Sequence, residues 1–291
     1  MPKSARNRQL AKQHARRKAE RRQHQRRRQT TTIAIALVVA LVGSFAAFLA
    51  FTGGDEPPLA ATGATKPTGS TGPSGATSAR PGSQTGTVQP EPGPDEVACG
   101  AEQPKTALRP KPQFSSPSEV VQRGRIYTAE IETSCGTIVV ELRAAEVPET
   151  VNSFVFLAEQ GYFDGQRFHR LDTSIDVVQG GDPTGTGTGG PGYSIPDELT
   201  GDEVYEPGVL AMANAGPNTG GSQFFFVTGP GASGLPPNYT IFGRVIEGLE
   251  VLELIQQLPI QDPDAAAQGD LSGQQPAKAV YIDKVTIRQG Q

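Results

Sequence analysis

Hydrophobic and polar positions alternate, or form short apolar blocks, along the C-terminal two thirds of the chain. Residues 125–143 ("RIYTAEIETSCGTIVVELR") alternate around a turn at 134–136, which predicts two paired strands. Further blocks rich in β-branched and aromatic residues are separated by Gly and Pro. They predict strands at 167–171, 175–180, 208–214, 223–229, 239–245 and 279–288.

Two segments repeat apolar residues at helical spacing instead. In residues 147–163, Pro148 suits a first helical turn, and the i, i+3, i+4, i+7 positions are Val151, Phe154, Val155 and Ala158. Residues 248–258 predict a second helix, which ends at Pro259. Residues 261–278 are typical of an irregular loop. Many short strands with only two helices predict a mainly antiparallel β-barrel with helices at its ends.

The N-terminal third has a different character. Residues 1–29 carry twelve Lys/Arg and one acidic residue, so they predict a basic tail. Residues 33–51 contain no charge and, at 1.5 Å per residue, are just long enough to cross a hydrocarbon core of about 30 Å. The long basic region and the absence of a clear A-x-A site favour an uncleaved transmembrane signal-anchor at 30–52 over a cleaved signal peptide.

The positive-inside rule then predicts a cytoplasmic tail and an extracytoplasmic C-terminal part. The arginines of the tail could also bind nucleic acid or anionic lipid. Beside a membrane span, topology and lipid headgroups explain them more simply, so no nucleic-acid partner is expected. Residues 53–97 are mostly Gly, Pro, Ser, Thr and Ala and predict a disordered linker. The folded domain is therefore expected over 98–291.

The chain has two cysteines, Cys99 and Cys135, and both follow the predicted span. In an oxidising exterior, two such cysteines suggest a disulfide that would fasten the start of the domain to its first hairpin. Two unrelated free thiols are the alternative.

Several kinds of site are disfavoured. "GTGTGG" at 185–190 matches a dinucleotide-binding pattern, but Pro191 and Gly192 follow at once, so no helix can begin there. The domain has one histidine, His169, which leaves neither a metal-ligand cluster nor a hydrolytic triad. No metal and no cofactor are expected.

A set of polar and aromatic residues remains at the ends of predicted strands: Arg170, Gln179, Asn214, Gln223, Phe225 and Tyr239. A guanidinium, side-chain amides and an apolar floor suit a site that binds a peptide and polarises an amide. The alternative is a surface arginine with buried amides that connect strands.

Four motifs carry a closer resemblance: "FHR" (168–170), "VQGGDPTGTGTGG" (178–190), "GVLAMANAGPNTGGSQFFF" (208–226) and "YTIFGRV" (239–245). Together they resemble the cyclophilin-type peptidyl-prolyl cis-trans isomerases, collinearly over 125–287. The resemblance implies an eight-stranded antiparallel closed barrel capped by two α-helices, with a proline-binding groove on its outer face. It also implies no cofactor, and proline-containing peptides and unfolded or exported proteins as partners. With the N-terminal segments, it suggests a bacterial membrane-anchored form with a monomeric domain.

Matched residue by residue, Arg170 takes the place of the family's catalytic arginine. The positions that correspond to its substrate-binding groove are Val177, Gln179, Gly187, Ala213, Asn214, Gln223, Phe225, Leu235 and Tyr239. The chain has no Trp, Gly234 stands near the usual rim tryptophan, and Tyr239 stands where many members have histidine. These departures imply weak sensitivity to cyclosporin.

One further departure concerns Asp176. The chain has one residue more than the common pattern between Arg170 and Gln179, so the pocket phenylalanine of the family falls on Asp176 or on Ile175. A carboxylate in the pocket would pair with Arg170 and compete with substrate. Two functions therefore stay open: an isomerase that assists folding of exported proteins, or a proline-binding or chaperone-like module with weak or no activity. A β-bulge before Val177 is expected to turn Asp176 out of the pocket.

Overall fold

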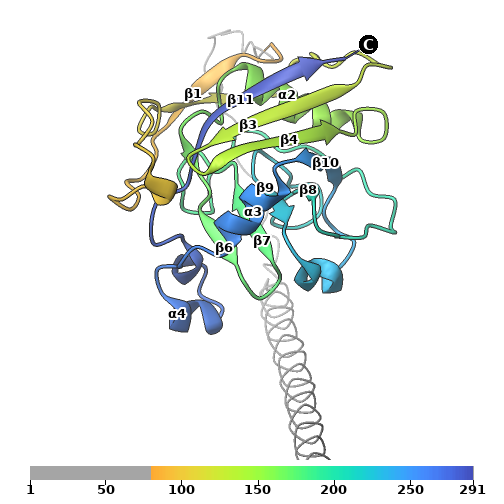
Figure 1. The fold of residues 1–291 in the computed structure, drawn as a ribbon. Helices are drawn as coiled ribbons and strands as arrows, with labels where there is room; N and C mark the ends of the chain where they lie inside the picture. The colour runs from red at the N-terminus through yellow and green to blue at the C-terminus, as the bar shows by residue number, and fades with distance from the viewer. Residues whose placement is uncertain (1–79, 291) are drawn as a thin grey trace, which may run out of the picture. The chain divides into compact units, whose positions relative to one another are not determined.

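A computed structural model describes residues 80–290, and its main feature is a curled antiparallel sheet (Figure 1). The sheet order is β5-β11-β3-β4-β10-β8-β9-β7-β6. The strands are β3 (Tyr127–Thr133), β4 (Gly136–Leu142), β5 (Gln166–Arg167), β6 (Arg170–Asp172), β7 (Val177–Gly180), β8 (Val209–Met212), β9 (Phe224–Val227), β10 (Ile241–Glu247) and β11 (Tyr281–Gln289). The predicted strands are thus present, and the mainly antiparallel fold class is confirmed.

The sheet differs in detail from the predicted closed barrel of eight strands. Its two edge strands, β5 and β6, are separated by only Phe168 and His169. The Phe168 N–H donates to the Val280 carbonyl (2.9 Å), whereas the His169 N–H donates to the Gln179 carbonyl (3.0 Å). The segment thus leaves β11 and joins β7 within two residues. This change of partner divides one predicted strand into two, so the curled sheet has nine strands, and its first and last strands belong to one continuous segment.

Both predicted helices are present and bury apolar side chains against the sheet. In α2 (Pro148–Glu159) Val151, Phe154 and Val155 are at most 1% exposed. In α3 (Leu249–Gln256) Leu252 and Ile255 are fully buried. The core is aromatic: the rings of Phe154, Phe163 and Phe224 lie with centroids 5.0 to 5.7 Å apart. Such edge and stacked contacts add to the stabilisation from burial itself.

The segment 261–278, predicted as an irregular loop, contains two short helices. These are α4 (Pro263–Ala267) and the 3-10 helix η3 (Leu271–Gln274). The carboxylates of Asp262 and Asp270 accept hydrogen bonds from backbone N–H groups in the first turns of the two helices. This capping stabilises helices that are too short to be recognised from apolar periodicity.

The predicted disordered linker, residues 53–97, includes residues that form a strand. Within it, β1 (Gln84–Val88) pairs antiparallel with β2 (Lys111–Phe114) as a separate two-stranded sheet. Four of the five residues of β1 are exposed, so main-chain pairing, not apolar burial, positions this strand. The composition of the segment could not reveal such pairing. The predicted tail and signal-anchor lie outside the described residues. Between residues 80 and 290, no helix is long and apolar enough to cross a membrane.

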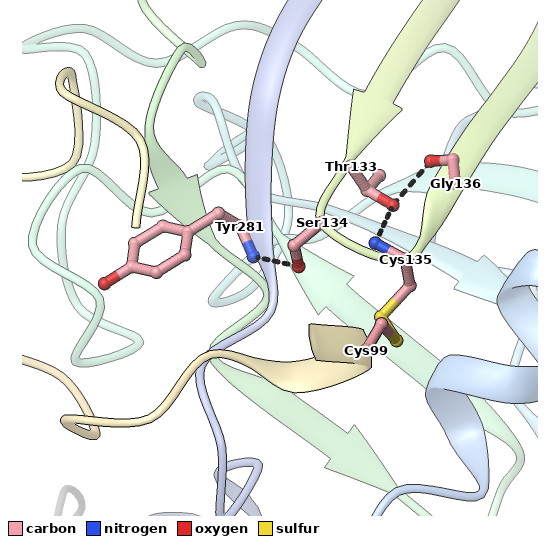
Figure 2. The surroundings of a disulfide bond; sticks show 6 residues. All are labelled: Cys99, Thr133, Ser134, Cys135, Gly136 and Tyr281. Carbon is pink, nitrogen blue, oxygen red and sulfur yellow. Dashed lines mark hydrogen bonds between the residues drawn. A yellow bond between two sulfur atoms is a disulfide. The ribbon is translucent and has the colours of Figure 1, made fainter. Parts of the chain in front are cut away.

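The predicted disulfide between Cys99 and Cys135 is formed, with Cα atoms 5.2 Å apart (Figure 2). Cys135 lies in the tight turn between β3 and β4, where the Thr133 hydroxyl accepts from the Cys135 N–H (3.1 Å) and donates to the Gly136 carbonyl (2.6 Å). The neighbouring Ser134 hydroxyl accepts from the Tyr281 N–H (3.1 Å). The bond therefore fastens the N-terminal lead-in to a turn that is already anchored to β11.

Candidate active site

The candidate site begins as a row of residues across adjacent strands. Arg170 of β6 pairs with Gln179 of β7, Gln179 with Phe225 of β9, and Phe225 with Ala211 of β8. Directly paired residues lie on the same face of a sheet. The neighbouring row is buried in the core, so this row lies on the outer face. The antiparallel register thus brings together residues that are far apart in the sequence.

A pocket lies along this row. Its lining combines the basic and amide side chains with apolar ones: Arg170, Ile175, Val177, Gln179, Ala213, Asn214, Phe225, Leu235 and Tyr239. All of these were candidates from the sequence. The rings of Phe225 and Tyr239 meet edge to face at 5.4 Å. They form an apolar floor and wall of the pocket.

Tyr205, which the sequence did not suggest, supports that wall. Its hydroxyl donates to the Tyr239 carbonyl (3.0 Å) and accepts from the Tyr239 N–H (2.9 Å). Tyr205 is only 2% exposed and packs beside Phe225, with ring centroids 6.3 Å apart. It lies within an irregular segment where no periodic pattern marks it as part of a site.

A chain of hydrogen bonds continues from the pocket. Arg170 Nη1 donates to Gln179 Oε1 (3.0 Å), and Gln179 Nε2 donates to Gln223 Oε1 (3.0 Å). Gln223 Nε2 then donates to the Gly187 carbonyl (2.9 Å). Gln223 and Gly187 therefore hold the polar side of the site in place but do not line the pocket itself.

Asn214 lies at the opposite side. Its Nδ2 donates to the Asn238 carbonyl (2.8 Å), which connects the strand end at β8 to the loop that carries Tyr239. The Ala213 N–H donates to the Gln223 carbonyl (2.9 Å). The Asn214 side chain and the Ala213 backbone thus fix this flank of the pocket to the neighbouring loop and to Gln223.

Two further residues contact Arg170. Asp172 Oδ2 accepts from Nη2 and Gln274 Oε1 accepts from Nε, each at 2.6 Å. Strand alternation could have indicated Asp172, because residues i and i+2 share a face. No sequence signal indicates Gln274, which is 104 residues away from Arg170 in a segment predicted to be a loop.

Asp176 does not enter the pocket; Ile175 does. The extra residue is accommodated in the turn between β6 and β7, where Asp176 adopts a left-handed conformation (φ 52°) that aspartate tolerates better than most residues. Its Oδ2 accepts from the Gly231 N–H (2.8 Å), and its carbonyl accepts from the Thr228 N–H (2.9 Å). The pocket is spared as expected, but by a turn and not by a β-bulge, because the β6–β7 pairing is regular.

His169 is adjacent to Arg170 but faces the opposite way. It is 6% exposed, and neither ring nitrogen has a hydrogen-bond partner within the described residues. Burial lowers the pKa of His169 to about 4, so its imidazole is neutral near pH 7. It is therefore not placed to exchange protons with a ligand in the pocket. Among residues 80–290, no three His, Cys, Asp or Glu side chains are grouped as a metal site requires.

Comparison with known proteins agrees with this geometry. Residues 128–287 match the family model described as "Cyclophilin type peptidyl-prolyl cis-trans isomerase/CLD". The chain belongs to the cyclophilin family. The matched range covers the nine-stranded sheet except Tyr127, Arg288 and Gln289, and it includes every pocket residue.

The chain is also similar to named proteins and to a solved structure. The "Probable peptidyl-prolyl cis-trans isomerase B" of Mycobacterium tuberculosis is 39% identical over 211 residues, which are 67% of this chain and 62% of that protein. The "Peptidyl-prolyl cis-trans isomerase ppi1" of Schizosaccharomyces pombe is 48% identical over 128 residues, 42% of this chain and 80% of that protein. A crystal structure of a Cryptosporidium parvum cyclophilin type isomerase matches with a TM-score of 0.49 at 30% identity, over 57% of this chain and 99% of that one. The chain thus spans less than two thirds of the mycobacterial relative.

Proposed function

We propose that this cyclophilin is an active peptidyl-prolyl cis-trans isomerase. The observation that carries the proposal is the Arg170 guanidinium at the side of an apolar pocket, hydrogen-bonded to the neighbouring Gln179. The pocket floor of Phe225, with Val177 and Leu235 beside it, would hold the proline ring. Gln179 and Asn214 would hold the flanking carbonyl and N–H groups of the peptide.

The chemistry requires no nucleophile. Amide resonance sets a barrier of about 18–20 kcal/mol to rotation of a peptide bond, and X-Pro bonds isomerise unaided in tens of seconds. When the bond twists, the prolyl nitrogen becomes pyramidal and its lone pair leaves conjugation. A hydrogen bond from Arg170 to that nitrogen strengthens as the bond twists, so it stabilises the transition state more than either ground state.

The cellular role follows from the N-terminal segments. We propose a cytoplasmic tail at 1–29, a signal-anchor at 30–52 and an extracytoplasmic isomerase domain that assists folding of exported proteins. The uncharged run at 33–51 and the basic excess before it support this topology. The disulfide is consistent with an oxidising exterior. Protease added to intact cells should degrade the domain and leave the tail; protection of the domain would contradict the topology.

The activity is tested with Arg170→Ala in the full-length protein. Line-shape or exchange NMR on a proline tetrapeptide measures isomerisation without a coupled protease. We expect turnover to fall at least about a hundredfold, the usual effect of removing one transition-state donor. Arg244→Ala is the matched control, since Arg244 is an exposed arginine of β10 outside the pocket.

Wild-type and Arg244→Ala proteins should turn over the peptide equally. Normal turnover by Arg170→Ala would refute the role of this residue. Peptide binding by the wild type without any turnover would instead support a proline-binding module.

A further inference from the structure

The Arg170 guanidinium is held by groups that do not line the pocket. Besides Gln179, it donates from Nη2 to Asp172 and from Nε to Gln274, each at 2.6 Å. The Arg170 side chain is 24% exposed, whereas that of Asp172 is 6% exposed and Gln274 is 7% exposed. The guanidinium of Arg170 therefore lines the pocket, while its Nε and Nη2 groups donate to two buried acceptors.

Asp172 is itself fixed. Its second oxygen, Oδ1, accepts from the Ser174 N–H (2.9 Å) and the Ser174 hydroxyl (2.6 Å) within the β6–β7 turn. Its carbonyl accepts from Gln256 Nε2 of α3 (3.2 Å). Both carboxylate oxygens of Asp172 therefore accept hydrogen bonds, which holds the side chain in one position as the acceptor for Arg170 Nη2.

Gln274 comes from a different part of the chain, the last residue of η3. The helix is pressed against the start of α4: a Cβ at Gly273 would lie 2.6 Å from the Asp262 carbonyl oxygen, so only glycine fits there. The Gln261 N–H donates to the Gln275 carbonyl (2.8 Å), and the Asp262 N–H donates to the Gly273 carbonyl (3.2 Å). These contacts fold the 261–278 segment into a compact unit that presents one glutamine to Arg170.

We propose that Gln274 is a positioning residue for isomerisation, acting through Arg170. A guanidinium has five N–H groups. The bonds to Asp172, Gln274 and Gln179 occupy three, and within the described residues one N–H on Nη1 and one on Nη2 are left for a substrate. Fixing Nε and Nη2 from behind sets the plane of the guanidinium before the peptide arrives. This inference rests on the proposed isomerase activity and identifies Gln274 as a residue that holds the hydrogen-bond donor Arg170 in place.

The physical reason is preorganisation. An unsupported arginine has several freely rotating bonds and must be ordered in the transition state, whereas a supported one needs no reorganisation. Loss of the Gln274 acceptor should therefore lower kcat more than it raises KM, because the pocket that binds the proline ring is unchanged.

Gln274→Ala in the full-length chain tests this proposal, with Gln275→Ala as the matched control. Gln275 is the next residue and the same residue type, but the described residues that accept hydrogen bonds from the Arg170 side chain are Gln274, Gln179 and Asp172 and do not include it. We expect kcat/KM of Gln274→Ala to fall about tenfold, mainly in kcat. Gln275→Ala should equal the wild type, and Gln274→Glu, which restores an acceptor oxygen, should recover most of the loss. Equal activity of the two alanine variants would overturn the proposal.

A second measurement separates this proposal from the activity itself. With ¹⁵N-labelled arginine, the Nε–H signal of Arg170 is assigned by its absence from Arg170→Lys. The bond to Gln274 should protect this proton from exchange in the wild type and in Gln275→Ala, and the protection should be lost in Gln274→Ala. Unprotected Nε–H in the wild type would refute the support of Arg170 by Gln274. Protection together with no turnover in the wild type would refute the isomerase function instead.

Discussion

Two rows of side chains cross strands β6, β7, β9 and β8, one residue apart along each strand. The inner row is Leu171, Val178, Phe226 and Leu210, and each of these residues is fully buried. The outer row is Arg170, Gln179, Phe225 and Ala211. The same set of paired strands thus carries a purely apolar row towards the core and a mixed polar and apolar row towards the pocket.

The contrast is clearest in the three consecutive phenylalanines of β9. Phe224 and Phe226 point inward and belong to the main core, whereas Phe225 points outward and packs with Val177 and Tyr205 in a smaller cluster. The same residue type therefore has two roles, decided only by the two-residue period of a strand. Inner-row changes should affect stability, and outer-row changes should affect activity.

Phe226→Ala should give the largest effect on stability. It removes a fully buried ring from a closed core and leaves a cavity, which costs about 3–5 kcal/mol in the free energy of unfolding. Urea denaturation measures this loss. Turnover per folded molecule should stay near the wild-type value, and a large loss of turnover at full folding would break the distinction between the rows.

Phe225→Ala should give the opposite balance. Its ring lines an open pocket, so truncation enlarges that pocket and should cost about 2 kcal/mol of stability, the value for lost burial alone. Without an apolar floor for the proline ring, kcat/KM should fall on the order of tenfold to a hundredfold. The same NMR assay and urea titration check both values. A stability loss equal to that of Phe226→Ala would show that the two clusters form one core.

A smaller effect concerns the adjacent pair His169 and Arg170, which face opposite sides. The pKa of His169 is about 4 in the folded state, below its ordinary value of 6.5. The unfolded chain therefore binds a proton that the folded chain does not, and stability falls as the pH drops from about 6.5 to about 4. The slope contributed by this group approaches about 1.4 kcal/mol per pH unit.

Urea titrations of the wild type and His169→Gln between pH 7 and pH 4 measure that contribution. The difference in unfolding free energy between the two proteins should be nearly constant close to pH 7 and should change as the pH falls from about 6.5 to about 4. A difference independent of pH would show that the pKa of His169 is the same in the folded and unfolded states.

The periodic features of the sequence explain how much could be predicted. The strand pattern predicted the strands that carry Gln179 and Phe225, and the helical spacing predicted α2 and α3. The pocket residues were reached by resemblance to a family with the same motifs. In each case the evidence lies in local sequence, where period and residue type determine which face a side chain occupies.

Other features depend on contacts that no local pattern encodes. The Arg170–Gln274 bond joins residues 104 positions apart, and its geometry exists only after α4 and η3 have folded together. β1 forms through main-chain pairing with β2, although its side chains resemble those of a linker. The position of Asp176 depended on whether the extra residue entered the strand or the turn. The left-handed backbone conformation of Asp176 places the extra residue in the turn, and the number of residues between Arg170 and Gln179 does not predict that conformation.

The arrangement of the sheet edges has a consequence for a protein whose proposed ligands are incompletely folded chains. Exposed edge strands attract other extended chains and promote aggregation. Here the edge strands of the nine-stranded sheet have only two and three residues, and they are consecutive in the sequence. A client chain of the proposed kind would therefore contact side chains in the pocket but find almost no free edge of this sheet on which to add a strand. The nine-stranded sheet is thus a poor template for the aggregation of such a chain.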